Sequence, residues 1–64
     1  MRKIAIEHYR DGKVHYEFFL EPGESAPTGG DIAAGSKCVD ISSGMVSLYS
    51  ESISDWKDQF SLQD

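Results

Sequence analysis

Residues 35–49 form the part of the chain that most constrains its fold. Two short apolar runs, residues 39–41 and 46–48, flank the sequence Ser42-Ser43-Gly44. Apolar runs of this kind on both sides of a Ser-Gly turn are typical of a β-hairpin. A loop of either two or four residues keeps the apolar side chains of both runs on one face. We therefore expect a small, strand-rich protein punctuated by turns.

The length of the chain predicts one domain, residues 1–64. A domain this small buries little apolar surface, so disulfides, metals or partner subunits commonly add stability. The single cysteine, Cys38, cannot form an intramolecular disulfide. We expect the extra stability to come from oligomerisation or from docking on a larger partner.

A first hairpin is predicted by two alternating segments, residues 3–9 and 14–20, on either side of Arg10-Asp11-Gly12. A two-residue loop would separate the apolar side chains of the two strands onto opposite faces. A three-residue loop with Gly12 in the left-handed conformation brings them to one face, and register follows the apolar pattern. We predict the three-residue loop, with His8 opposite Val14. The shared face is then formed by Ile4, Ile6, Val14, Tyr16, Phe18 and Leu20.

Residues 21–36 hold both prolines and four of the six glycines, which predicts a long loop. Ile32 is expected to anchor this loop to the sheet. In residues 50–64, Ile53, Trp56 and Phe60 have helical spacing, but Trp56, Phe60 and Leu62 also alternate with polar residues as in a strand. We favour the strand, and with it an all-β antiparallel meander of four to five strands. The alternative is an α+β fold with a short C-terminal helix. The rest of the expected core is Val39, Ile41, Val46, Leu48 and Trp56.

The charge is unevenly distributed along the chain. Residues 1–13 carry four Lys or Arg against two acids, whereas residues 14–64 carry two against nine. Because phosphate contacts need clustered cations, this balance argues against direct binding to nucleic acid. The apolar run after Met1 is too short for a signal segment, and no window resembles a membrane span. We expect a protein of the cytoplasm, or part of something assembled there, and the lone thiol fits a reducing compartment.

Residues capable of catalysis or metal binding are few. His8, His15 and Glu17 would lie on one face only with the two-residue loop, and the three-residue loop separates the histidines. No histidine that could act as a base lies near Cys38 in the sequence. The glycines match no phosphate-binding pattern. We therefore expect no catalytic residue, no metal, no cofactor and no enzymatic activity.

Phe19 is the clearest candidate for a contact with another protein. Its neighbours Phe18 and Leu20 are expected to point inward, so Phe19 points outward, beside Ala5 and on the face of Glu17. An exposed aromatic side chain in so small a domain is typical of an interaction surface. Tyr49 and Ile32 are the other interaction candidates.

The second hairpin also resembles a known group of proteins. The pattern Gly35-Ser36-x-x-x-Asp40-Ile41-Ser42-Ser43-Gly44-x-Val46-x-x-Tyr49, followed by Trp56, resembles small β-meander accessory and structural proteins of tailed bacteriophages and prophages. The resemblance covers roughly residues 20–60. It implies a virion-associated or accessory role through self-association or through binding a larger virion or host protein. The excess of acids over bases in residues 14–64 suggests an alternative function. In this alternative the chain is a small inhibitor that mimics DNA and blocks a host defence or nucleic-acid enzyme.

Overall fold

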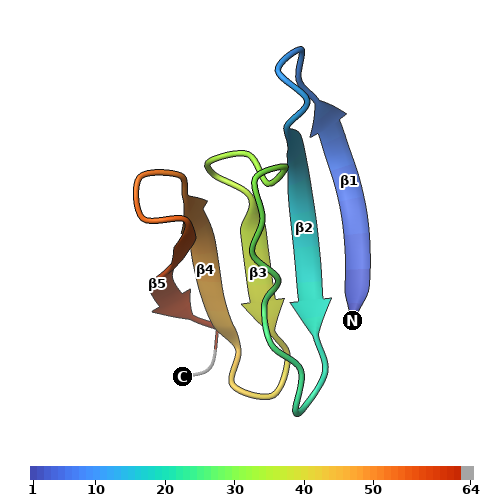
Figure 1. Ribbon diagram of the computed structural model, residues 1–64. Coiled ribbons are helices and arrows are strands. Elements are labelled where there is room, and N and C mark those ends of the chain that lie inside the picture. Colours follow the sequence, from blue (N-terminus) through green and yellow to red (C-terminus); the bar gives the residue numbers. More distant parts are fainter. Residues whose placement is uncertain (63–64) are drawn as a thin grey trace.

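The protein is one mixed five-stranded sheet, with the strands side by side in the order β1-β2-β3-β4-β5 (Figure 1). A computed structural model describes residues 1–62, so the last two residues of the predicted tail lie outside it. The strands are β1 Arg2–His8, β2 Val14–Leu20, β3 Lys37–Asp40, β4 Met45–Ser50 and β5 Asp55–Ser61.

The all-β prediction is confirmed, and the C-terminal segment is the strand β5. The expectation of a wholly antiparallel meander is wrong at one pair, because β2 and β3 run parallel. The other three pairs are antiparallel. A parallel pair needs a connection of a dozen or more residues that returns across the sheet, and residues 21–36 are long enough to provide it.

Residues 21–36, here called the crossover loop, return across one face of the sheet in a right-handed connection (Figure 1). The loop docks along β2 through backbone hydrogen bonds. The Val14 N–H donates to the Asp31 carbonyl at 2.7 Å, and the Ala33 N–H donates to the Val14 carbonyl at 2.9 Å. Between them, Ile32 forms an isolated parallel bridge with Val14. We call the covered side the loop-side face and the other side the open face.

The core lies between the crossover loop and the loop-side face. Trp56 packs at its border, with its ring edge-on to Phe18 at 5.8 Å and close to perpendicular to Tyr49 at 5.1 Å between ring centres. The Trp56 indole Nε1–H also donates to the Pro27 carbonyl at 2.8 Å, which ties the loop to β5. The buried cluster is formed by Val14, Tyr16, Phe18, Leu20, Ile32, Cys38 and Tyr49.

Ser36 is fully buried at the start of β3. Its Oγ accepts a hydrogen bond from the Tyr16 N–H at 3.1 Å, and its carbonyl accepts one from the Tyr49 N–H at 2.9 Å. A buried backbone N–H without a partner is costly. The Ser36 side chain therefore supplies the acceptor for the Tyr16 N–H of β2 at the position just before β3 begins.

The first hairpin has the predicted three-residue loop, with Gly12 at a φ of 87° and His8 opposite Val14. Beyond the turn, a register shift at Ile6 puts Ala5 opposite Tyr16 and Ile4 opposite Glu17. The prediction that Ile4 and Ile6 join the core face is therefore wrong. A β-bulge of this kind displaces the rest of the strand by one residue, which reverses the faces.

The second hairpin has the four-residue loop, because Asp40 pairs with Met45 and Gly44 has a φ of 73°. Val39 and Val46 pair directly on one face, as expected. That face lies opposite the buried cluster, because the parallel pairing of Phe18 with Cys38 puts Cys38 on the loop-side face instead. Val46 is buried there, as expected of a core residue, whereas Val39 is only half-buried and Leu48 and Ile41 are exposed, so the core prediction is wrong for those three.

Replacing Ser36 tests whether its side chain serves as the acceptor for the Tyr16 N–H of β2. We expect Ser36→Ala to lower the free energy of unfolding by about 1–3 kcal/mol, because the buried Tyr16 N–H loses its acceptor. Urea denaturation measures this. Ser25→Ala, at an exposed loop position, should change it by less than about 0.5 kcal/mol. Equal effects at the two serines would contradict the role given to Ser36.

Replacing Trp56 tests the attachment of the crossover loop. Trp56→Phe keeps an aromatic ring but removes the donor to the Pro27 carbonyl, so amides of residues 25–30 should exchange roughly fivefold faster, as loss of about 1 kcal/mol implies. Hydrogen exchange read by NMR measures this. Tyr9→Phe, at an exposed site, is the control. Unchanged exchange in Trp56→Phe would show that this bond does not hold the loop.

Candidate functional site: the open face of the sheet

A row of apolar side chains crosses the open face. Phe19 lies beside Val39 on the parallel neighbour, Val39 pairs with Val46, and Val46 pairs with Phe60. Residues paired across neighbouring strands point to the same side of a sheet, so these four side chains form one continuous line. We call them the apolar row. Val46 at its centre is only 5% exposed, whereas Phe60 at its edge is 57% exposed.

A second row, next to the apolar row, combines apolar and charged side chains. Ile4 pairs with Glu17, and the Glu17 carboxylate lies 3.4 Å from the Lys37 ammonium. Lys37 pairs in turn with Leu48, and Leu48 with Lys57. Both members of the Glu17–Lys37 pair are partly exposed, so the pair adds little stability. It sets a charged border beside an apolar surface.

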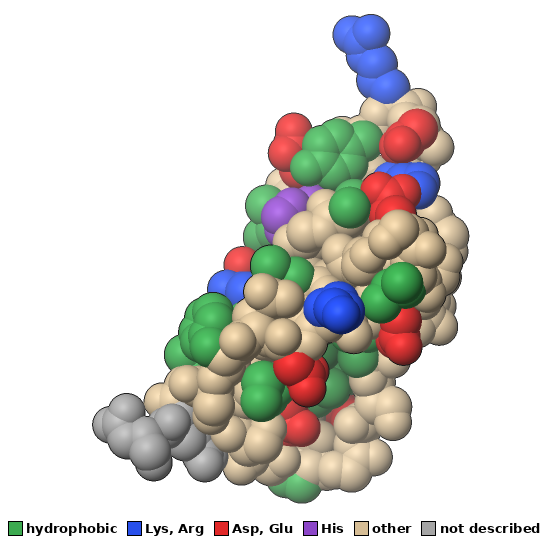
Figure 2. All heavy atoms as spheres, turned by 90° about the vertical axis from the view of Figure 1, so that its left-hand side faces the viewer, with side chains coloured by type: hydrophobic (Ala, Val, Ile, Leu, Met, Phe, Trp, Pro, Cys, Tyr) green, Lys and Arg blue, Asp and Glu red, His purple; other side chains and the backbone are tan. Residues whose placement is uncertain are grey.

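The open face has no second layer within residues 1–62. Strand contacts are made between neighbouring strands of the one sheet, and the crossover loop lies on the other side. Figure 2 views the sheet from its β5 edge, and hydrophobic side chains lie along the side away from the loop, with charged groups between them. Apolar surface gathered in this way is typical of a binding surface.

Phe19 and Glu17 lie together on the open face, as predicted. The neighbour of Phe19 on β1 is Arg2, whose guanidinium lies 5.8 Å from the ring centre. The prediction that Ala5 lies beside Phe19 is wrong, because the bulge at Ile6 puts Ala5 opposite Tyr16 on the loop-side face.

The structure places the other two interaction candidates in the core. Tyr49 is 5% exposed and its hydroxyl donates to the Gly29 carbonyl at 3.3 Å. Ile32 is 3% exposed and anchors the crossover loop, as expected. These two residues hold the loop over the sheet, and the open face does not include them.

The sequence alone did not indicate that Val39, Val46 and Phe60 lie on the open face, away from the buried cluster. Their apolar character predicts burial wherever a second layer covers them. The feature of the sequence that could have distinguished the two faces is the length of the crossover loop. A loop that must return across the sheet covers one side only.

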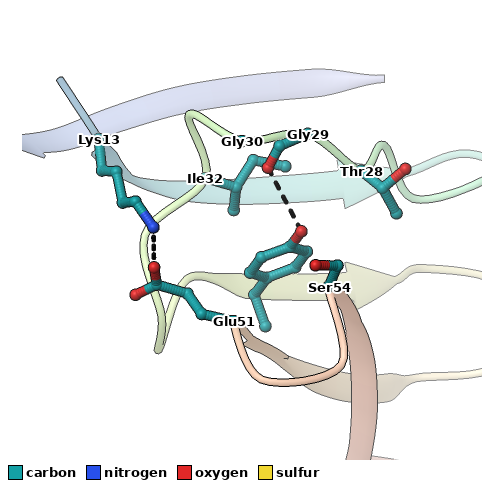
Figure 3. A pocket seen from close by; sticks show the side chains of 8 residues that line it. Lys13, Thr28, Gly29, Gly30, Ile32, Glu51 and Ser54 are labelled. Atoms are coloured by element: carbon teal, nitrogen blue, oxygen red, sulfur yellow. Dashed lines mark hydrogen bonds and ion pairs between the residues drawn. The ribbon is translucent and has the colours of Figure 1, made fainter.

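A pocket of about 310 Å³ opens on the loop-side face between the crossover loop and the β4–β5 turn. The Lys13 ammonium and the Glu51 carboxylate form an ion pair at its rim (Figure 3). Glu51 also accepts a hydrogen bond from the Ala34 N–H at 3.2 Å. The two charged groups at this pocket therefore bond each other, and they connect the crossover loop, the first hairpin and the β4–β5 turn.

A larger groove of about 520 Å³ lies over β3–β5, where the crossover loop leaves the loop-side face uncovered. Trp56 and Met45 contribute apolar surface, and Asp40, Asp55 and Asp58 contribute carboxylates. Asp58 accepts a hydrogen bond from Ser47 Oγ at 2.8 Å. The Ser42 hydroxyl lowers the pKa of Asp40 by bonding its carboxylate. The groove is therefore negatively charged at neutral pH.

The candidate catalytic residues are kept apart. His8 lies on the loop-side face opposite Val14, whereas His15 lies on the open face opposite Glu7. Burial, and then the charge of Asp40, raises the pKa of the Cys38 thiol, which is 3% exposed. Within residues 1–62, no three His, Cys, Asp or Glu side chains are placed to hold a metal ion. In the same residues, no helix is long and apolar enough to cross a membrane.

No family model, curated protein or solved structure matches this chain. The resemblance to phage proteins thus stays a prediction, and the function must be inferred from the geometry of the sheet.

The buried Cys38 thiol predicts a specific loss of stability in alkali. Its pKa is raised in the folded protein, so this contribution is present below about pH 8.5, where the unfolded thiol ionises, and is lost as pH rises above it. Cys38→Ala lacks this term. The difference in free energy of unfolding between wild type and variant should therefore shrink from about pH 7 to about pH 10. Urea denaturation under reducing conditions measures it, and a constant difference would contradict burial of the thiol.

Proposed function

We propose that this chain is a non-enzymatic interaction protein that presents the open face of its sheet to another protein. The observation that carries the proposal is the apolar row on the open face, in which Phe60 is 57% exposed and Phe19 and Val39 are half-buried, over a face without a second layer within residues 1–62. The apolar surface that these side chains still expose gains free energy when a partner removes it from water.

The size of the face suggests the kind of contact. A five-stranded sheet with strands of this length covers on the order of 500 Å². A standard stable interface buries about 800 Å² on each partner. We infer a small contact through the open face, or one that continues onto neighbouring surface, with the Glu17–Lys37 pair at the polar rim.

The setting we propose is that of a phage or prophage accessory protein, associated with a virion or present in the host cytoplasm. The support is the Asp40-to-Tyr49 hairpin pattern together with an architecture made of strands and turns. The partner would then be a larger virion or host protein, or a second copy of the chain.

An acidic inhibitor of a nucleic-acid enzyme is a second candidate. Asp40, Asp55 and Asp58 around the groove on the loop-side face support it. Mimicry of DNA needs dense rows of carboxylates, because it reproduces the regular spacing of phosphates. Here Glu7 and Glu17 lie on the opposite face, which favours the first proposal. Recovery of a nuclease or polymerase with the immobilised protein would favour the inhibitor.

Site-specific photocrosslinking tests the proposed role of the open face. Benzoylphenylalanine is placed at Phe60 in one variant and at Phe19 in another, and each is irradiated in the cells that produce the protein. Because both positions lie in the apolar row, we expect a discrete covalent adduct from each, identified by mass spectrometry.

Ile53 provides a matched control. It is 55% exposed, close to the 57% of Phe60, but it lies in the β4–β5 turn, away from the apolar row. The proposal fails if Ile53 gives the same adducts as Phe60, or if neither Phe19 nor Phe60 gives any.

A further inference from the structure

The groove on the loop-side face, over β3–β5, joins a buried floor to partly exposed apolar walls. The crossover loop does not extend over β4 and β5 (Figure 1). Leu20, Cys38 and Ser47 line the groove and are buried, whereas Met45 and Trp56 line it and are half-buried. Its volume of about 520 Å³ is within the roughly 300–1,000 Å³ that is typical of ligand sites. The groove is therefore large enough to take a side chain of another molecule.

Three carboxylates line the same groove, and neutral donors of the chain hold each of them in place. Asp58 accepts a hydrogen bond from the buried Ser47 hydroxyl at 2.8 Å, and Asp55 accepts the backbone N–H of the next residue at 2.8 Å. Asp40 accepts bonds from the Ser42 hydroxyl at 2.7 Å and the Ser42 N–H at 3.1 Å. A carboxylate has sites for about four hydrogen bonds, so each of the three can accept further donors.

No cation of the described residues balances these carboxylates. The groove lining contains neither Lys nor Arg. The ion pairs within residues 1–62 use Glu17, Glu24 and Glu51 as their acids. Lys57 is next to Asp58 in the chain, but it pairs with Leu48 and so belongs to the open face. Because charges of one sign around a cleft concentrate the electric field within it, the groove attracts cations.

The combination of apolar and acidic surface indicates which cation the groove fits. A metal ion would make no use of Trp56 and Met45, and within residues 1–62 no three His, Cys, Asp or Glu side chains are placed to hold one. An arginine side chain has a methylene stem that packs on apolar surface. Its flat guanidinium stacks on aromatic rings and donates paired hydrogen bonds to carboxylates. Lysine offers a more strongly hydrated point charge without this paired geometry.

We propose that this groove binds an arginine side chain of a partner protein, with the stem against Trp56 and Met45 and the guanidinium among the three aspartates. Arginine is enriched at the centres of protein interfaces, where it is often a residue on which affinity depends. The groove lies on the opposite side of the sheet from the apolar row. Binding in the groove is therefore independent of what covers the open face.

The fluorescence of Trp56 tests the proposal, because it is the one tryptophan of the chain. The probe is a blocked peptide of glycine and serine with one central arginine, titrated to millimolar concentration. In two matched peptides, citrulline, which is uncharged, or lysine replaces the arginine. We expect the arginine peptide to change the emission saturably. The citrulline peptide should bind at least about tenfold more weakly, and the lysine peptide also more weakly than the arginine peptide.

Three results of these titrations would overturn the proposal. The first is the absence of a saturable change with the arginine peptide. The second is binding of the citrulline or lysine peptide as tight as that of the arginine peptide. The third is a change of Trp56 emission when the protein concentration alone is raised, because a second copy of the chain would then fill the groove.

A variant of Asp58 tests whether the groove carboxylates hold the arginine. Asp58→Asn removes one charge and keeps an oxygen that can accept the Ser47 hydroxyl. It should bind the arginine peptide at least about fivefold more weakly, as loss of a charge-assisted hydrogen bond implies. Asp11→Asn makes the same change at an exposed position in the first hairpin, outside the groove, and should bind like wild type. Equal binding by the two variants would contradict the proposal.

NMR of the wild type covers the case in which Asp58→Asn does not fold. On addition of the arginine peptide, signals of the Met45 methyl group and of the Trp56 indole should shift, because both residues line the groove. The methyl signals of Val39 and Val46, on the open face, should not shift. Shifts confined to Val39 and Val46 would place the peptide on the open face and would overturn the proposal.

Discussion

Strands β2 and β3 run parallel, and this pairing obliges residues 21–36 to return across the sheet before β3 can begin. The return path lies on one face, where it brings Ile32 against β2 and Pro27 against Trp56. Within residues 1–62, no second element lies over the other face. The division into a covered face and an open face thus follows from one strand direction.

Polar groups, as well as apolar contacts, hold the crossover loop. Ser36 supplies an acceptor for β2 where the backbone of β3 has not yet begun, and the Tyr49 hydroxyl and Trp56 indole reach loop carbonyls. Each bond satisfies a buried or partly buried group that would otherwise lack a partner. The aromatic side chains that look like candidates for binding are in this way used to build the loop-side face, and Phe19 and Phe60 are left on the other.

Local features of the sequence predicted most of the elements. The Arg10-Asp11-Gly12 loop, the hairpin turn around Ser43-Gly44 and the alternation around Trp56 are read from neighbours in the chain, and the structure has all three, although the sequence left open whether that turn has two or four residues. Strand direction between β2 and β3 could not be read in this way, because it depends on where a sixteen-residue loop runs. The bulge at Ile6 was equally hidden, since Ala5 and Ile6 are both acceptable on either face. One parallel pair and one bulge account for the misplaced core residues and for the new neighbours of Phe19.

The two faces of the sheet have separate roles. The loop-side face holds the buried cluster, and the apolar row on the open face is suited to a partner that covers it. The function proposed for the chain therefore depends on the crossover loop lying on one side only.

Nuclear Overhauser contacts from the Ile32 methyl groups test this placement most directly. The account predicts contacts from these methyls to loop-side residues of the core such as Val14 and Tyr49, and none to the rings of Phe19 or Phe60. Contacts from Ile32 to Phe19 or Phe60 would place the loop over the apolar row, and the open face proposed here would not exist.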